Sequence, residues 1–222
     1  SIIFSSFINC LQGKKKKQFA LLIDPDKTDP PALARLAAEA DRAQVDYFFV
    51  GGSLLINAFF ETCIRSLKEH CSIPVVLFPG NGLQISGNAD AMLFLSLISG
   101  RNPEMLIGRH VIAAPYIRAA GLEVIPTGYM LVESGLPTAV SYMSNTTPIP
   151  ADKNDIAICT AMAGEMLGLR LIFMDAGSGA KNPVSAAMIG AVSGSVSVPV
   201  IAGGGIKTPA KAVENCKAGA DV

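Results

Sequence analysis

The chain has 222 residues, of which 50% are hydrophobic and 16% charged, and its formal net charge at pH 7 is zero. This length suits one larger domain with a substantial core, and the balanced charge argues against a protein built to attract nucleic acid or a strongly acidic partner. Aromatic residues make up 6% and tryptophan is absent, so we expect an aliphatic core, as in strands buried on both faces.

Cellular location is indicated by what the sequence lacks. The five cysteines have no CxxC spacing and are odd in number, which predicts small buried residues in a reducing, cytoplasmic compartment, with no disulfide framework or zinc site. Residues 1–6 lack the charged start and cleavage site of a signal peptide. The longest apolar stretch, residues 91–98, is too short to cross a bilayer. A transient contact with a membrane surface remains an open alternative.

Short apolar runs alternate with helix-like segments along the chain. An amphipathic lead-in helix is expected at residues 1–12, and the lysines at 14–17 predict a solvated turn, in preference to a membrane or nucleic-acid patch. The expected strands are 19–23, 47–50, 74–78, 91–97, 122–125, 171–174 and 198–201, with extended pieces at 129–132 and 139–142 and a strand beginning at 220–222. The expected helices are 31–43, 56–70, 103–120, 152–167, 183–192 and 209–218.

This alternation predicts an α/β protein with a parallel sheet that helices cover on both faces. A strand count near eight favours a closed (β/α)8 barrel over an open doubly wound sheet, and no GxGxxG motif follows the first strand. Glycines at 80, 82 and 87 predict an irregular segment in place of the third helix. We therefore expect one barrel domain over residues 1–222, with the last β-α unit incomplete.

Two glycine-rich turns near the C-terminal end each follow an apolar strand and precede a helix. They are Met174-Asp-Ala-Gly-Ser-Gly-Ala180 and Ala202-Gly-Gly-Gly-Ile206. Glycine lets the backbone approach phosphate oxygens, and a helix N-terminus favours negative charge. In a (β/α)8 barrel, the loops after strands seven and eight often form a joint phosphate site. Either turn alone could simply link a strand to a helix.

Carboxylates at two strand ends are candidates for chemistry. Asp24 could hold Mg²⁺, with an oxygen from Ser53, although a helix-capping role is equally compatible with its position. Asp175 could bind a substrate hydroxyl or take its proton, or could merely cap its turn. Glu133 is a second candidate for the base, ranked after Asp175. Two histidines, His70 and His110, fall in predicted helices, and we expect them to be surface or packing residues in preference to catalytic ones.

Six motifs, taken together and in order, resemble those of the geranylgeranylglyceryl phosphate synthase family, which also contains the bacterial heptaprenylglyceryl phosphate synthases. The resemblance runs from residue 19 to residue 222 and is greatest with the archaeal-type group, which has bacterial members. The motifs are Leu21-Leu-Ile-Asp-Pro-Asp-Lys27, Val50-Gly-Gly-Ser53, Val76-Leu-Phe-Pro-Gly-Asn81, Tyr129-Met-Leu-Val-Glu133, Asp175-Ala-Gly-Ser-Gly-Ala180 and Gly203-Gly-Gly-Ile206.

The resemblance implies a cytoplasmic, homo-oligomeric prenyltransferase with a modified TIM-barrel fold. Such an enzyme joins a prenyl diphosphate, here geranylgeranyl diphosphate, to sn-glycerol 1-phosphate and releases diphosphate. It implies Mg²⁺ at Asp24 and Ser53, and Asp175 as the base. The acceptor would be held by Phe173, Met174, Asp175, Ala176, Gly177, Ser178, Gly179, Gly203, Gly204 and Gly205, and by a further loop expected beyond Val222.

The chain departs from this family at the first glycine turn. Family members often have Tyr-Leu-Glu where this chain has Phe173-Met174-Asp175, so the tyrosine hydroxyl is lost and the carboxylate is one methylene shorter. Two other functions would share the glycine turns. One is a different phosphate-binding barrel enzyme, such as a sugar-phosphate isomerase, and the other is a phosphate-binding barrel without catalytic activity.

Overall fold

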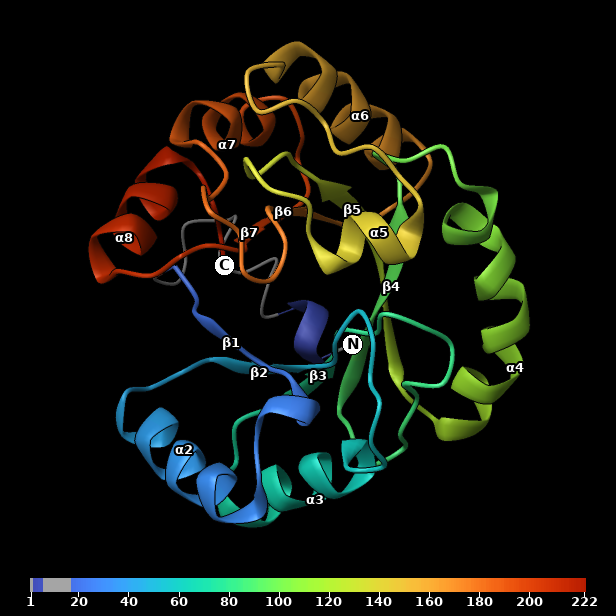
Figure 1. Ribbon diagram of the computed structural model, residues 1–222, viewed down its shortest axis with the longest axis vertical. Coiled ribbons are helices and arrows are strands. Elements are labelled where there is room, and N and C mark those ends of the chain that lie inside the picture. The colour runs from blue at the N-terminus through green and yellow to red at the C-terminus, as the bar shows by residue number, and fades with distance from the viewer. Residues whose placement is uncertain (1, 6–16) are drawn as a thin grey trace. The chain divides into compact units, whose positions relative to one another are not determined.

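The computed structural model describes residues 2–5 and 17–222 (Figure 1). Within these ranges seven strands alternate with helices, and their order in the sheet is their order in the chain, β1 to β7. Residues 2–5 are helical, whereas the rest of the predicted lead-in helix and residues 14–16 of the lysine run lie outside the described residues. The chain divides into two compact units, which are described in turn.

Unit 1 comprises residues 18–94 and 109–125. Its strands pair in parallel, with Ile23 opposite Val50 and Val50 opposite Leu77. Two of its helices, α2 and α3, lie side by side (Figure 1) and bury apolar side chains against the strands. The elements are β1 (Ala20–Ile23), η1 (Pro25–Lys27), α2 (Pro30–Arg42), β2 (Tyr47–Val50), α3 (Phe60–His70), β3 (Val75–Leu77), the start of β4 (Ala91–Leu97) and α4 (Arg109–Ala120).

Unit 2 comprises, among the described residues, 2–5, 17, 95–108 and 126–222. Strand β6 lies between two parallel neighbours, with Leu131 and Gly203 both paired with Asp175. Helices α6, α7 and α8 lie side by side along the outside of this unit (Figure 1). Its elements are η2 (Glu104–Gly108), most of β5 (Glu123–Leu131), α5 (Ala139–Ser144), α6 (Asn154–Met166), β6 (Leu171–Asp175), α7 (Ala186–Ser193), β7 (Val200–Gly203) and α8 (Pro209–Ala218).

The extended piece predicted at residues 139–142 is wrong, because this segment forms helix α5. Thr138 starts the helix through a capping box in which its side chain accepts from the N–H of Ser141 and the Ser141 hydroxyl accepts from the N–H of Thr138. Such a cap satisfies N–H groups that a helix start leaves unpaired, and here it outweighs the alternating polarity of the sequence. The piece predicted at 129–132 instead belongs largely to β5, which continues from the predicted strand at 122–125.

Two predicted helices begin later than expected, and side-chain hydrogen bonds to the backbone explain both. The carboxylate of Asp26 accepts the N–H of Ile56 at 2.7 Å, which keeps residues 56–59 out of α3. The hydroxyl of Ser185 accepts the N–H of Met188 at 3.2 Å and sets the start of α7. Hydrogen bonds of this kind, including the cap at Ser185, fix where a helix begins more closely than hydrophobic periodicity does.

The irregular segment predicted after the third strand is confirmed, since residues 78–90 contain no helix.

The segment predicted to begin a further strand, residues 220–222, runs beside β7. The N–H of Asp221 donates to the carbonyl of Val200 at 2.7 Å, and that of Ala202 to the carbonyl of Val222 at 3.1 Å. Among the described residues, no helix combines the length and the apolar character needed to span a bilayer.

Candidate active site

Asp175 ends strand β6 and is buried, with 6% of its surface exposed. Its Oδ2 accepts a hydrogen bond of 2.5 Å from the hydroxyl of Tyr129, which lies on the neighbouring strand β5. Its Oδ1 accepts the N–H of Gly177 at 2.7 Å, two residues further along the turn. Both carboxylate oxygens are therefore held by donors, and the carboxylate is fixed at the base of the first glycine turn.

The protonation of this pair follows from its burial. Burial raises the pKa of Asp175, and the hydrogen bonds from Tyr129 and Gly177 lower it again by a smaller amount. The pKa of Tyr129 is raised well above its usual value, first by burial and then by the adjacent carboxylate. Tyr129 therefore keeps its proton and acts as a donor, while Asp175 is a stronger base than a carboxylate in water.

The two predicted glycine turns are brought together in unit 2. The N–H of Ala176 donates to the carbonyl of Gly203 at 3.1 Å. A Cβ on Gly204 would lie 2.5 Å from Oδ1 of Asp175 and 2.7 Å from the nitrogen of Gly177, and Gly204 has a φ of +78°. Only glycine fits this position without a shift of the backbone, because both the space and the dihedral angle exclude a side chain.

A third segment touches the first turn. A Cβ on Gly177 would lie 2.8 Å from Cγ2 of Thr138, the residue that caps α5. The N–H of Asn182 donates to the carbonyl of Ser134 at 3.0 Å, so the loop after β5 also binds the end of this turn. The glycine turn therefore lies between β7's loop and the residues that lead into α5.

The residues predicted to bind the acceptor differ in accessibility. Ser178 and Gly179 are exposed, and residues 203–205 are half-buried. In contrast, the side chains of Phe173, Met174 and Ala176 are buried, with Met174 and Ala176 completely enclosed. The buried members hold the turn in place, and the exposed members are those that a ligand in solvent could reach.

In unit 1, Asp24 follows β1 and caps the short helix η1. Its Oδ1 accepts the N–H of Asp26 at 3.1 Å, and its Oδ2 forms an ion pair of 2.9 Å with the ammonium group of Lys27. The side chain of Asp24 is 26% exposed and that of Lys27 is 69% exposed. Asp24 thus fills the capping role considered from the sequence, and its outer oxygen already faces a positive charge.

Ser53 lies in the half-buried loop after β2, beside the loop that follows β3. A Cβ on Gly52 would lie 3.4 Å from Oδ1 of Asp24, and a Cβ on Gly80 would lie 2.2 Å from the carbonyl oxygen of Gly52. The two loops are therefore in backbone contact next to Asp24. In the described part of the chain, no three His, Cys, Asp or Glu side chains gather into a metal-binding cluster.

Gln84 is a residue of this site that the sequence reasoning missed. Its side chain is buried, and its Oε1 accepts the N–H groups of Gly52 and Gly80, each at 3.2 Å. Its Nε2 donates to the carbonyl of Gly52 at 2.7 Å. A glutamine within a glycine-rich segment was the available signal, but nothing in the sequence tells which backbone groups such an amide binds.

The remaining candidates lie outside these arrangements. Glu133 is exposed, and its N–H donates to the carbonyl of Ile149 at 2.8 Å. His110, in α4, packs edge-on against Phe94, and His70 is exposed at the end of α3, where its Nδ1 lies 2.7 Å from the carbonyl oxygen of Ser66. Both histidines lie in helices, one packed and one at the surface, as expected.

The four described cysteines are free thiols. Cys63 is buried, whereas Cys159 is exposed, so the expectation of buried cysteines is wrong for Cys159. Cys10 lies outside the described residues.

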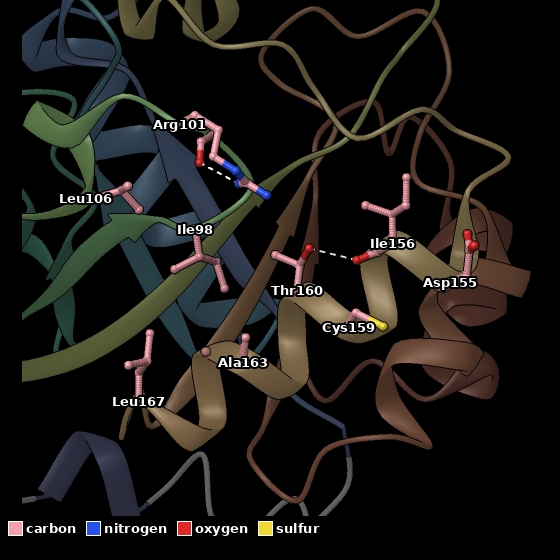
Figure 2. A pocket seen from close by; sticks show the side chains of 11 residues that line it. Ile98, Arg101, Leu106, Asp155, Ile156, Cys159, Thr160, Ala163 and Leu167 are labelled. Carbon is pink, nitrogen blue, oxygen red and sulfur yellow. Dashed lines mark hydrogen bonds between the residues drawn. The ribbon is translucent and has the colours of Figure 1, made fainter.

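A groove of about 590 Å³ lies in unit 2 between the segment after β4 and helix α6. In Figure 2, Ile98 and Leu106 line one side, and Thr160 and Ala163 of α6 line the other. The lining is mainly apolar and includes none of the residues predicted to bind substrate or metal.

Comparison with known proteins decides the family. The model of the PcrB family matches residues 12–222. The chain belongs to the PcrB family. Two relatives named geranylgeranylglyceryl phosphate synthase support the predicted resemblance. That of Chitinophaga pinensis is 58% identical over 220 residues, 99% of this chain and 87% of the relative. That of Spirosoma linguale is 56% identical over 207 residues, 93% of this chain and 83% of the relative.

A solved structure extends the comparison to the fold of this PcrB-family chain. The (S)-3-O-geranylgeranylglyceryl phosphate synthase of Thermoplasma acidophilum, in complex with its substrate sn-glycerol-1-phosphate, superimposes with a TM-score of 0.92 at 34% identity. The match covers 99% of this chain and 87% of that protein. The predicted α/β class, a modified TIM barrel with an irregular segment in place of the third helix, is confirmed.

Proposed function

We propose that the protein is a prenyltransferase that joins a long-chain prenyl diphosphate to sn-glycerol 1-phosphate. The hydroxyl oxygen of the acceptor attacks C1 of the prenyl chain, the bond from C1 to the diphosphate oxygen breaks, and the hydroxyl proton passes to a base. The products are an ether-linked lipid precursor and diphosphate. The observation that carries the proposal is the buried pair of Asp175 and Tyr129 directly beneath the paired glycine turns.

The glycine turns of unit 2 supply the anchor for the acceptor's phosphate. Ser178, Gly179 and residues 203–205 are the accessible parts of these turns, and glycine backbone can approach phosphate oxygens closely. Fixing the phosphate there orients the rest of a small molecule, which lowers the entropy cost of reaching the reactive geometry. A phosphate anchor next to a base fits an acceptor that carries both a phosphate and a hydroxyl group.

Asp175 serves as the base in this proposal. Its raised pKa makes it a better proton acceptor than an ordinary carboxylate, and the Tyr129 hydroxyl holds it in one orientation. Phe173 has no hydroxyl, and the hydroxyl that holds Asp175 comes from Tyr129 on the neighbouring strand. Asp175 keeps the proton as the ether bond forms.

We propose that unit 1 holds the donor's diphosphate and Mg²⁺. The donor set fits this ion, because Mg²⁺ binds through one or two carboxylates and completes its shell with water and substrate phosphates. Oδ2 of Asp24 faces the ammonium group of Lys27 at 2.9 Å, and the Lys27 side chain is 69% exposed, which supports a site where a metal ion would take the place of the ammonium group. When bound, Mg²⁺ would stabilise the negative charge of the leaving diphosphate. Asp24 and Ser53 would hold it.

Apolar side chains on the same loops suit a prenyl chain. Leu54 and Ile56 follow Ser53 and are 53% and 83% exposed, and Leu83, in the loop after β3, is 90% exposed. Exposed apolar residues grouped around a polar site favour an amphipathic ligand. This grouping supports a donor with an apolar tail over a sugar phosphate.

The homo-oligomer and the cytoplasmic location remain predictions. Helix α4 supports self-association, because Val111, Ile112 and Tyr116 are each more than 60% exposed on its surface. Light scattering of the wild-type protein and of Ile112→Glu tests this point. We expect the wild type to be an oligomer and the variant to shift towards the monomer.

Product analysis tests the proposed function directly. Purified protein with Mg²⁺ is incubated with labelled sn-glycerol 1-phosphate and prenyl diphosphates of increasing chain length, and the lipid product is identified by mass. We expect an ether product with geranylgeranyl diphosphate and little with the enantiomer sn-glycerol 3-phosphate. Absence of ether product with every donor would refute the proposal, and phosphate binding without product would favour a non-catalytic barrel.

A further inference from the structure

Gln84 joins the loop after β2 to the loop after β3. The carboxamide oxygen accepts from the N–H groups of Gly52 and Gly80, and the carboxamide nitrogen donates to the carbonyl of Gly52. The side chain is 2% exposed, so these three bonds are made away from solvent. A buried amide whose donor and acceptor are both used fixes the groups around it, since breaking any bond would leave a buried polar atom unpaired.

The two loops around Gln84 approach each other so closely that side chains on Gly51 and Gly80 would not fit between them. A Cβ on Gly51 would lie 2.0 Å from the carbonyl oxygen of Phe78, and a Cβ on Gly80 would lie 2.7 Å from Cα of Ser53. Glycine permits this approach, but it also leaves the chain conformationally free. The position of the Gly52–Ser53 peptide therefore depends on the hydrogen bonds from Gln84.

We propose that Gln84 is a positioning residue for the donor side of the reaction. It holds the Gly52–Ser53 peptide beside Asp24, so that the Ser53 oxygen and the loop backbone are set for the donor's diphosphate and its cation. The inference rests on the proposed function, because it assigns the donor to unit 1. Gln84 itself is buried and touches neither substrate.

A purely structural role makes a different prediction. If Gln84 only stabilised the fold, its loss would lower stability without favouring one substrate over the other. A positioning role confines the effect to the ligand that binds these loops. Residues that hydrogen-bond to the ligand-binding groups, without contacting the ligand, typically change affinity or activity by about 10–100-fold when they are replaced.

The test compares Gln84→Met with Gln18→Met. Gln18 is also a buried glutamine of unit 1, but it precedes β1 and donates from Nε2 to the hydroxyl of Tyr47 at 2.8 Å. Both variants lose a buried amide and keep a side chain of similar length. For each protein, the rise in melting temperature is measured with inorganic pyrophosphate plus Mg²⁺ and, separately, with sn-glycerol 1-phosphate. The KM values for both substrates are measured as well.

We expect Gln84→Met to lose most of the thermal shift with pyrophosphate and Mg²⁺ and to raise the donor's KM by about tenfold or more. The thermal shift and KM with sn-glycerol 1-phosphate should stay at wild-type values. Gln18→Met should lower the melting temperature without separating the two ligands. Equal effects of Gln84→Met on both ligands, or the same separation in Gln18→Met, would overturn the inference.

Gln84→Glu provides a second variant that depends on pH. In this variant an ionised carboxylate would repel the carbonyl of Gly52, whereas the protonated acid can donate to it and still accept from the two N–H groups. Burial raises the pKa of such a group, so we expect the donor's KM to fall towards the wild-type value as the buffer is made mildly acidic. A donor KM that does not respond in this way counts against positioning, as does failure of both Gln84 variants to fold.

The wild-type protein separates this inference from the proposed function. If the wild type forms no ether product, the proposed function fails and this inference fails with it. If the wild type forms the product and Gln84→Met leaves the donor's KM unchanged, the inference alone fails.

Discussion

The hydroxyl of Tyr129 donates to the carboxylate of Asp175 at 2.5 Å, and each residue is 6% exposed. The contact joins two neighbouring strands, because Tyr129 lies opposite Phe173 in the register of β5 and β6. A buried carboxylate with its oxygens held in this way can accept a proton without having to reorient.

Replacement of Asp175 by Asn should abolish most of the activity. The amide has nearly the same shape but cannot accept the acceptor's proton, so we expect kcat to fall by about 10²–10⁴-fold. Binding of sn-glycerol 1-phosphate should remain, because the glycine turns are unchanged. Steady-state kinetics and calorimetric titration check the two parts. An unchanged kcat would remove Asp175 from the mechanism.

The same substitution should stabilise the protein at neutral pH. Burial raises the pKa of Asp175 in the folded state, so its ionised form costs stability, and this cost appears as the pH rises through the folded pKa. Asp175→Asn has no such cost. We expect its melting temperature to exceed that of the wild type at pH 7, and the difference to shrink below the unfolded pKa of 3.8. A melting-temperature series against pH measures this, and a constant difference would contradict it.

Tyr129→Phe should move the acidic limb of the activity profile to higher pH. The Tyr129 hydroxyl lowers the pKa of Asp175, so its removal raises that pKa. Activity requires the ionised base and declines as the pH falls through its pKa, and this decline should therefore begin at a higher pH. The profile of kcat/KM against pH gives the result. A limb that stays in place would show that Tyr129 does not act on the base.

Gly204→Ala should impair both folding and acceptor binding. Its methyl group would lie 2.5 Å from Oδ1 of Asp175, in addition to the strain of a φ of +78°. Gly168→Ala is the matched control, because Gly168 has a φ of +88° and open space around its Cβ position. We expect the control to lose about 1–2 kcal/mol of unfolding free energy from strain alone. Gly204→Ala should lose more, and the KM for sn-glycerol 1-phosphate should rise in this variant only.

Asp24→Asn should lower the catalytic efficiency with the prenyl diphosphate and raise the Mg²⁺ concentration that the reaction needs. We expect kcat/KM for the prenyl diphosphate to fall by about 10²-fold or more, because a metal's stabilisation of transition-state charge is worth several kcal/mol. Asp29→Asn is the control, since Asp29 caps α2 and Asn caps helices equally well. Titration with Mg²⁺ at fixed donor distinguishes the variants. Equal Mg²⁺ requirements in both would argue against a metal at Asp24.

Local signals explain which parts could be predicted from the sequence. Strand β2 was predicted at its observed bounds because it is a short apolar run next to glycines, and both glycine turns lie at strand ends as expected.

The contact of Tyr129 with Asp175 could not be predicted, since it spans 46 positions and depends on strand register. Gln84 was missed for a similar reason, because its partners Gly52 and Gly80 are chosen by loop packing. The error at residues 139–142 shows a short-range cap overriding alternation.

The contact between Thr138 and Gly177 links a helix end to the glycine turn. Thr138 belongs to the capping box of α5, so the same side chain starts that helix and packs against the glycine turn. By thermodynamic linkage, a ligand that orders the turn would also favour the folded α5, and a substitution that frays α5 would weaken the binding of that ligand. Under the proposed function, a six-residue helix that contributes no predicted ligand contact would therefore share in the affinity for the acceptor.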